Sequence, residues 1–275
     1  MHIASLPSQG GIGDFGAEAY GFVDFLKKSG QKYWQILPLC PVGRGNAPYS
    51  SSSAFAGEIL FISLDMLARD GYLNPDDITQ PDFGKNTDYK AAREFKLPLI
   101  KRAADNFDIK NRDFKSFLRE NAYWLEDFAL FTALKAVYRK KSFTELNDEL
   151  KYRFPAAIER FKKTHAEEIL FYEITQFFFF TQYFRLKAYA NENGIKIIGD
   201  IPFYVQLESA DVWSNPDIFR LGRDMTPVLV AGVPPDIFSS DGQLWGNPIY
   251  DWDYQKTNDY AWWRCLLYTS DAADE

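Results

Sequence analysis

Apolar residues recur at helical spacing near the start of the chain and predict its first helix. The positions i, i+3, i+4 and i+7 are all apolar in one stretch: Ala19, Phe22, Val23 and Leu26. This spacing is typical of an amphipathic helix, which we expect over Ala17–Ser29 with Gly30 after its last turn. Apolar segments on either side, His2–Leu6 and Tyr33–Leu39, predict strands. Together they predict a β-α-β unit with parallel strands.

The pattern changes to helical from about Leu60 to Asn193. Four large apolar residues share one helical face: Trp124, Leu125, Phe128 and Leu134. A second long helix contains the run QFFFF and ends at Gly194. An apolar segment of the kind found in parallel strands follows at Ile195–Val205. Because residues 40–194 far exceed the length of one crossover helix, we expect a helical subdomain inserted between two strands.

Composition and charge narrow the class of protein. The chain has 275 residues, of which 46% are hydrophobic and 17% aromatic, and its formal net charge is -7. A nucleic-acid partner is not expected, because no block of Lys and Arg could meet phosphates. A membrane partner is not expected either, because the richest apolar run is too short to cross a bilayer. The first residues do not follow a secretory signal pattern, and we predict a cytoplasmic protein.

Counts of histidine and cysteine limit the chemistry. Only His2 and His165 are present, and Cys40 and Cys265 lie far apart, so no zinc motif or disulfide framework can be assembled. His165 lies in a charged helical stretch, where a solvated surface position is expected. Any chemistry in this chain therefore falls to carboxylates.

Residues 11–16 read GIGDFG, which matches the spacing of a dinucleotide-binding loop. Two features of its context argue against a nucleotide-dependent oxidoreductase. Four residues separate the expected strand from the first glycine, whereas the fingerprint follows the strand directly. The second strand also ends without the carboxylate that would hold a ribose. We interpret the stretch as a tight loop that leads into a helix.

Residues 40–58 form a long loop rich in Gly, Pro and Ser whose Tyr49 and Phe55 favour an ordered structure. Asp200 lies where an expected strand ends, a position that suits either a site or a cap. Trp245 suits a site as well as a core, and Asp236, which follows two prolines, suits a turn.

Several stretches of the chain resemble the 4-α-glucanotransferases of glycoside hydrolase family 77. They are HIASLPSQGGIGDFG, YWQILPL, GNAPYSSSSAFAGE, GDIPFYV with SADVW, and VAGVPPDIFS with GQLWGNPIYDW. The resemblance implies an α/β fold, a partial TIM (β/α)8 barrel holding about the first three strands, with a large helical insertion between strands two and three. It implies transfer of α-1,4-glucan segments between maltooligosaccharides by a retaining mechanism that uses two carboxyl groups. No metal or organic cofactor is expected.

The resemblance also implies roles for individual residues. Tyr49 and Trp245 would pack on glucose rings, and Asp200 would bind sugar hydroxyls. Asp236 and Gln243 would lie in a loop that borders the acceptor side and can act as a lid. Cys40 stands where the family usually has glycine, and a small buried residue is expected there.

The family's Arg-Ile-Asp-His stretch, which carries the nucleophile, does not occur in this sequence, nor do its later acid/base Glu and stabilising Asp motifs. We therefore expect no catalytic residue here and no transferase activity from this polypeptide alone. The expected divisions are strands one and two with their loop (1–59), the helical insertion (60–194), strand three with a substrate-binding loop (195–264) and a non-native tail (265–275). The alternative is a non-catalytic carbohydrate-binding module built on Tyr49 and Trp245.

Overall fold

The computed structural model describes residues 1–8, 10–79, 81–84, 86–139 and 141–269. Its helices and strands follow one another in this order: α1 (Ala17–Lys28), β1 (Tyr33–Gln35), α2 (Leu64–Arg69), α3 (Tyr89–Asp105), α4 (Arg112–Glu120), α5 (Ala122–Val137), α6 (Asp148–Lys151), α7 (Pro155–Thr164), α8 (Ala166–Glu192), β2 (Lys196–Ile198), α9 (Ala210–Ser214), β3 (Val230–Val233), β4 (Gln243–Pro248), α10 (Trp252–Thr257) and α11 (Ala261–Thr269).

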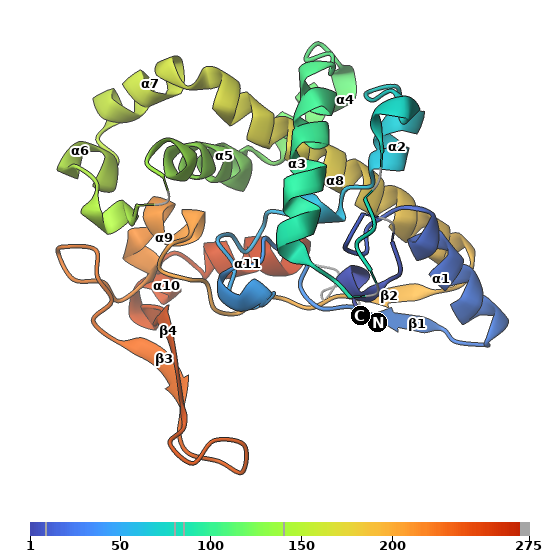
Figure 1. Cartoon of the computed structure of the whole chain (residues 1–275). Coiled ribbons are helices and arrows are strands. Elements are labelled where there is room, and N and C mark those ends of the chain that lie inside the picture. The colour runs from blue at the N-terminus through green and yellow to red at the C-terminus, as the bar shows by residue number, and fades with distance from the viewer. Residues whose placement is uncertain (9, 80, 85, 140, 270–275) are drawn as a thin grey trace.

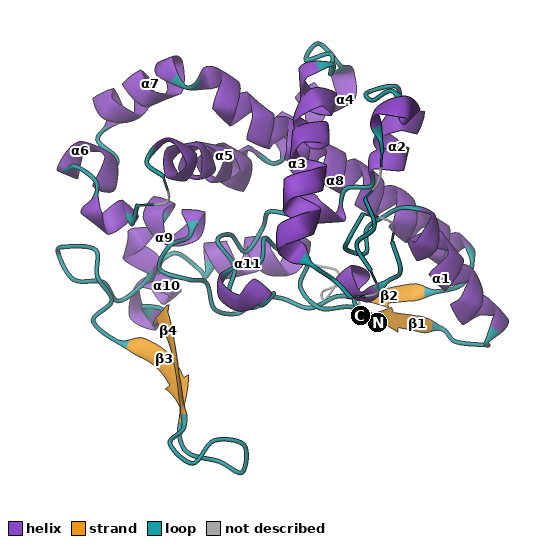
Figure 2. Ribbon diagram, viewed as in Figure 1, coloured by secondary structure: helices purple, strands orange, loops and turns teal. Residues whose placement is uncertain are grey.

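Helices dominate the molecule, and the long helix α8 runs diagonally through it (Figure 1). Two short parallel strands, β1 and β2, lie side by side near α1, while the β3–β4 hairpin projects from the opposite part of the body (Figure 2). Among the described helices, none combines the length and apolar character needed to cross a bilayer.

The parallel pair joins segments that are far apart in the sequence. Trp34 lies opposite Ile197, and Ile36 N–H donates to the carbonyl of Ile198 at 3.0 Å. Both strands begin close to the predicted positions but are shorter than predicted. Proline interrupts each apolar segment, at Pro38 and Pro202, and a proline nitrogen cannot donate to a strand ladder.

The strand predicted at His2–Leu6 is wrong, because Ile3–Ser5 forms a 3-10 turn. Leu6 N–H donates to the carbonyl of Ile3 at 3.0 Å, so the backbone is satisfied locally. The carbonyl of Ala4 accepts from Gly13 N–H and from the Thr87 hydroxyl, which leaves it no strand partner. The described chain thus contains two of the three expected parallel strands.

The helix predicted at Ala17–Ser29 is confirmed as α1, and Gly30 adopts a φ of +71° directly after it. Its charges suit the helix dipole, with Glu18 in the first turn and Lys27 and Lys28 in the last. The predicted helical face at 124–134 is confirmed too, since its four large residues are buried in α5.

Helix α8 is buried on several sides, which explains its four consecutive phenylalanines. Phe177 contacts Phe114, and Phe178 contacts Tyr72. Phe179 contacts Phe15 of the GIGDFG loop, while Phe180 contacts Trp124 on α5. The run therefore lies against different neighbours instead of one apolar stripe.

Two apolar clusters make up the core. The first combines α1, β1, β2, α2, α3 and the second half of α8. The second combines α5, α6, α7, α9 and α11 with the loop that follows β2. Phe180 packs against both clusters, so α8 links them. The divisions expected at 59, 194 and 264 stay predictions.

Candidate functional site

Two predicted site residues from distant parts of the chain meet directly. The Tyr49 hydroxyl donates a 2.5 Å hydrogen bond to Asp200 Oδ2. Tyr49 belongs to the loop after β1, and Asp200 follows the end of β2 by two residues. Because the carboxyl ends of neighbouring parallel strands lie at one edge of a sheet, their loops converge there.

The pair is accessible and chemically polarised. Tyr49 keeps 43% of its surface exposed, so its ring can contact a ligand. The hydrogen bond to Asp200 raises the pKa of Tyr49 to about 12, with partial burial and the negative charge of the carboxylate as smaller causes. The phenol is therefore neutral at physiological pH and donates its proton to Asp200.

Buried carboxylates hold both ends of the loop that carries Tyr49. At one end Glu58 accepts from Val42 N–H at 2.9 Å and Leu60 N–H at 3.1 Å. At the other, Asp211 Oδ2 accepts from Ala54 N–H at 2.9 Å. Each carboxylate satisfies backbone donors that would otherwise be buried without partners.

Serine and glutamine side chains complete the support of this loop. Ser53 Oγ accepts from the backbone N–H groups of Phe55 and Ala56, both at 3.2 Å. Gln176 of α8 pairs with both polar backbone groups of Gly57, at 2.7 and 3.0 Å, as a neighbouring strand would. The loop is thus ordered without strands of its own, as its composition predicts.

The loop after β2 connects this pair to the projecting hairpin. The Tyr204 ring meets Trp245 edge-on, with centroids 6.1 Å apart. Asn247 Nδ2 donates to the carbonyl of Val205 at 2.9 Å. The loops after β1 and β2 and the base of the hairpin therefore form one continuous region.

The remaining predicted residues lie on that hairpin. Trp245 is 45% exposed, and its Nε1 donates to Gln243 Oε1 at 3.3 Å. Asp236 Oδ1 accepts from Phe238 N–H and Ser239 N–H at 2.8 and 2.9 Å, so Asp236 shapes the turn. In the described part of the chain, neither Asp236 nor Gln243 has a hydrogen bond to Tyr49 or Asp200.

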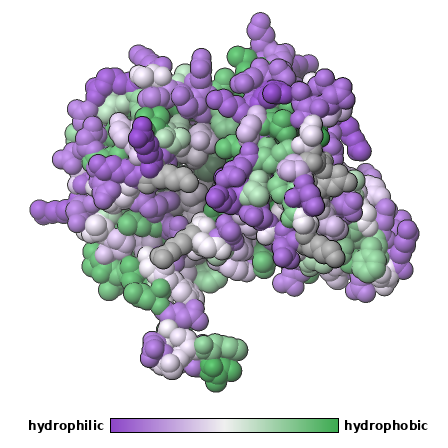
Figure 3. Space-filling view, viewed as in Figure 1, coloured by the Kyte–Doolittle hydropathy of each residue, from purple (hydrophilic) through white to green (hydrophobic). Residues whose placement is uncertain are grey.

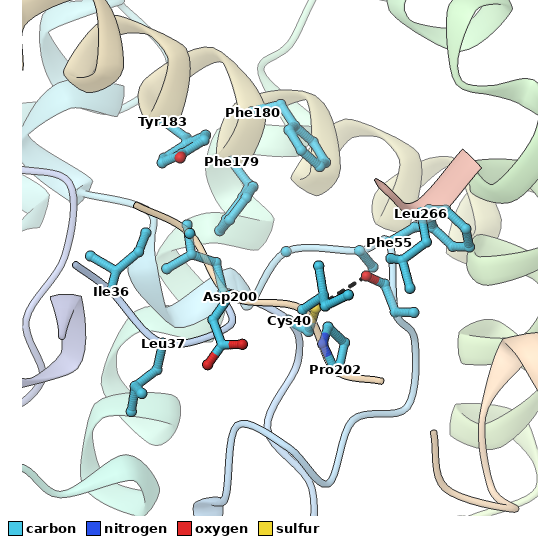
Figure 4. Close-up of a pocket in the computed structure, with 16 residues that line it drawn as sticks. Ile36, Leu37, Cys40, Phe55, Phe179, Phe180, Tyr183, Asp200, Pro202 and Leu266 are labelled. Atoms are coloured by element: carbon cyan, nitrogen blue, oxygen red, sulfur yellow. Dashed lines mark hydrogen bonds between the residues drawn. The ribbon is translucent and has the colours of Figure 1, made fainter. Parts of the chain in front are cut away.

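A small cavity of about 90 Å³ lies beside Asp200, between β1, the loop after it and α8. Figure 4 shows the Asp200 carboxylate directed away from the rings of Phe179 and Phe180. Cys40 is buried here and its thiol donates to the carbonyl of Ala54 at 3.3 Å (Figure 4). Burial raises the pKa of the Cys40 thiol, which keeps it unreactive. The expectation of a small buried residue is confirmed.

The GIGDFG loop has a structural role. Lys96 of α3 is fully buried and donates to Asp14 Oδ2 at 2.8 Å, while Asp14 Oδ1 accepts from Gly16 N–H where α1 begins. A Cβ on Gly13 would lie 1.9 Å from the carbonyl oxygen of Ile3, so only glycine fits. These contacts agree with a tight loop that leads into a helix.

The solvated position expected for His165 is only partly correct. His165 lies between α7 and α8, half-buried, with its ring centroid 4.4 Å from that of Phe161.

Comparison with known proteins decides the family. The sequence profile of the 4-alpha-glucanotransferase family, glycoside hydrolase family 77, matches residues 1–273. The chain belongs to this 4-alpha-glucanotransferase family. Among its relatives, the 4-alpha-glucanotransferase of Clostridium butyricum is 46% identical over 96% of the chain and that of Thermus thermophilus 42% identical over 96%.

Solved structures agree with the family. An amylomaltase from Streptococcus agalactiae in complex with acarbose superposes with a TM-score of 0.91 at 44% identity, over 98% of this chain and 55% of that one. An amylomaltase from Corynebacterium glutamicum, 19% identical with a TM-score of 0.73, shares the fold over 98% of this chain and 38% of its own. The chain spans about half the length of the 4-alpha-glucanotransferases it matches, 55% for the Clostridium enzyme and 53% for the Thermus enzyme.

Sequence reasoning missed the residues that hold this candidate site together. Asp211 was visible only as the acid of the SADVW stretch, and Glu58 only as the residue that ends the long loop. Tyr204 lies in GDIPFYV, yet nothing in that pattern indicates a contact with Trp245. The two carboxylates are important because they are buried, and the spacing of apolar residues in the sequence does not predict which loops are buried.

Proposed function

We propose that this chain supplies a glucan-binding part of a 4-α-glucanotransferase, with Tyr49, Asp200, Asp236, Gln243 and Trp245 as its sugar contacts. The observation that carries the proposal is the Tyr49–Asp200 pair at the carboxyl ends of β1 and β2. It is supported by the family to which the chain belongs and by the acarbose complex of its Streptococcus agalactiae neighbour.

The chemistry of the region suits a carbohydrate. The exposed faces of Tyr49 and Trp245 offer apolar surfaces for the C–H groups of a pyranose ring. Asp200 Oδ2 accepts from the Tyr49 hydroxyl, which orients the carboxylate, and Oδ1 would accept from a sugar hydroxyl. Gln243 and Asp236 would add amide and carboxylate contacts from the hairpin, which would close as a lid on the acceptor side.

In the whole enzyme, we propose a retaining double displacement within a (β/α)8 barrel to which β1 and β2 belong. One carboxylate would form a glycosyl-enzyme intermediate, and a second carboxyl group would act as acid and then as base. Neither group is assigned to this chain, whose part would be to bind and orient the glucan. The 275-residue polypeptide alone would therefore transfer no glucan.

The binding part of the proposal is tested by titrating the chain with acarbose and with maltohexaose. We expect saturable binding that weakens at least tenfold, about 1.4 kcal/mol, in Y49A, D200N and W245A. Phe25→Ala is the matched control, because Phe25 is an exposed aromatic residue on α1, outside the three loops. Failure of the unaltered chain to bind either sugar, or equal losses in F25A, would overturn the proposal.

The transfer part is tested by incubation with maltotriose. We expect neither glucose nor longer maltooligosaccharides above a blank. Their appearance would show that the chain carries its own nucleophile, and the assignment of catalysis to residues outside it would be wrong. Binding without transfer agrees with the proposed part and with the alternative of a carbohydrate-binding module.

A further inference from the structure

The loop that carries Tyr49 is joined to the segment after Asp200 by a short ladder of contacts. Gln206 N–H donates to the carbonyl of Ser51 at 3.3 Å, and Ala210 N–H donates to that of Ser52 at 2.9 Å. The third contact is the hydrogen bond from Ala54 N–H to Asp211. This last contact is the one made by a side chain, and the acceptor is a carboxylate, which makes it the strongest of the three.

Asp211 is placed to fix the geometry of both segments at once. Its side chain is buried in the second apolar cluster, at the second position of α9. While Oδ2 accepts from Ala54, Oδ1 accepts from Trp262 Nε1 of α11 at 3.3 Å. With both oxygens occupied, a carboxylate that turns away from either donor leaves a buried N–H group unsatisfied, which is unfavourable.

The position of Ala54 matters because its other polar group is also fixed. Its carbonyl accepts the Cys40 thiol, so Ala54 lies in a chain of contacts from Cys40 through the backbone to Asp211. Cys40 lies five residues after the end of β1, and Tyr49 lies between Cys40 and Ala54 in sequence. Asp211 therefore closes the base of the loop whose outer part bears Tyr49.

We infer that Asp211 is a positioning residue of the glucan site: through Ala54 it holds the Tyr49 loop against the loop of Asp200 and so maintains the Tyr49–Asp200 hydrogen bond. This inference rests on the proposed function for its biological meaning. The geometric claim itself concerns two protein groups and can be tested without any sugar.

The test follows the Tyr49 phenol by NMR in the whole chain labelled with ¹³Cζ-tyrosine, with the Tyr49 signal assigned by its loss in Y49F. At pH 10.5 an ordinary tyrosine is about three-quarters ionised, whereas a phenol with a pKa near 12 stays almost entirely protonated. We expect Tyr49 to be protonated in the unaltered chain and largely ionised in D211N. In D211N the single amide oxygen can accept from only one of the two donors, Ala54 N–H and Trp262 Nε1. The NH2 group then faces the other donor, so that hydrogen bond is lost.

Asp127→Asn is the matched control, because Asp127 of α5 is a part-buried carboxylate of the same region that pairs with Arg153 at 2.5 Å instead of the loop. D127N should lower stability but leave Tyr49 protonated. If Tyr49 stays protonated in a folded D211N chain, or is ionised equally in D127N, the inference is wrong. If D211N does not fold, W262F replaces it as the test, because this change removes the indole donor to Asp211 Oδ1. Partial ionisation of Tyr49 in W262F would support the inference, and a fully protonated Tyr49 would overturn it.

A double-mutant cycle at pH 7.5 links the geometry to the sugar. If Asp211 acts through Tyr49, D211N weakens maltohexaose binding in the unaltered chain and has little further effect in Y49F. Additive losses would contradict that route. Loss of sugar binding in every variant, including the unaltered chain, would contradict the proposed function instead and leave the NMR result standing.

Discussion

Glu173 of α8 is a carboxylate in unfavourable surroundings. It lines a groove of about 310 Å³ whose walls include Leu125, Ile169 and Leu170. Burial raises the pKa of Glu173 to about 7, and the negative charge of Glu126 adds to the rise. Lys162, the nearby cation, forms a salt bridge with Glu126, which limits what it can offer Glu173.

The raised pKa of Glu173 predicts that the stability of the chain falls as the pH rises. Between pH about 4.5 and 7 the unfolded chain releases the Glu173 proton while the folded chain keeps it, so the free energy of unfolding decreases through that window and levels off above it. Glu173→Gln mimics the protonated form. We expect the free energy of unfolding of E173Q to be about 1–2 kcal/mol higher than that of the unaltered chain at pH 8, a value reduced for partial solvent exposure. At pH 4.5 the two free energies should be equal.

Urea unfolding at the two pH values measures this difference. Asp211, whose burial raises its pKa to about 6, contributes a slope of the same sign, but it is common to both chains and cancels. Glu167→Gln, at an exposed position in the first turn of α8, serves as the control and should show no gain. A loss of stability in E173Q at pH 8 would contradict the expectation.

The candidate site shows what single residues reveal in a sequence and what they conceal. Asp200 could be singled out because it ends an apolar strand segment, whereas a sugar-contact role for Tyr49 was implied only by the family resemblance. Their contact could be expected only once the two strands were taken to be neighbours in one sheet. Asp211 was not predicted as a site residue, because it matters through its hydrogen bond to the buried Ala54 N–H. No local sequence pattern indicates which N–H groups of a loop are buried away from water.

At the scale of elements, the helices α1 and α5 were predictable, whereas the strand predicted at His2–Leu6 does not form. Helices α1 and α5 carry apolar residues at the helical period, which predicts both of them. His2–Leu6 has a strand-like composition, but the carbonyl of Ala4 accepts hydrogen bonds from Gly13 N–H and from the Thr87 hydroxyl. The segment therefore forms a 3-10 turn. Tertiary partners decided that segment, because the apolar character of five residues is too weak a signal to outweigh them.

The β3–β4 hairpin carries several strongly exposed apolar side chains. Ile237 and Phe238 at its end are 92% and 85% exposed, and Leu244 nearby is 80% exposed. The space-filling view shows apolar atoms gathered at the end of the projection (Figure 3). A surface of this kind favours association with other apolar surfaces, including those of further copies of the chain.

We predict that I237S/F238S reduces self-association of the chain without lowering its melting temperature, because these side chains contribute little to the core. Sedimentation velocity over a range of concentrations, together with thermal unfolding, measures both properties. Ile109→Ser changes an exposed apolar residue outside the hairpin and should leave association unchanged. Equal association of the double variant and the unaltered chain would show that the hairpin is not responsible.

At the scale of the whole molecule, α8 joins the two apolar clusters. Phe180 packs on both, with its ring 5.1 Å from that of Phe179 in the first cluster and 5.8 Å from that of Trp124 in the second. A shared helix of this kind makes the clusters dependent on each other, so we expect them to unfold together. The sequence could not reveal this coupling, since the QFFFF run alone does not tell which neighbour each ring meets.

Phe180→Ala tests the coupling. It removes a large ring between the clusters and should cost about 2–4 kcal/mol. Fluorine NMR of 5-fluorotryptophan then follows Trp34 in the first cluster and Trp213 in the second during urea unfolding. We expect both signals to move to the same lower midpoint. A shift of the Trp213 signal alone would mean that the clusters unfold independently.

The hydrogen bond between Tyr49 and Asp200 spans 151 residues of chain. At the usual pace of about 5–20 residues per second, a ribosome takes roughly 8–30 s to travel from one partner to the other. During that time β1 has been made and β2 has not. The edge of β1 that pairs with β2 therefore has no strand partner while the intervening helices are synthesised. Helix α1, which is made before β1 and contacts Trp34 through Phe22, can cover β1 first, and the Tyr49–Asp200 contact forms only after the whole helical segment has been made.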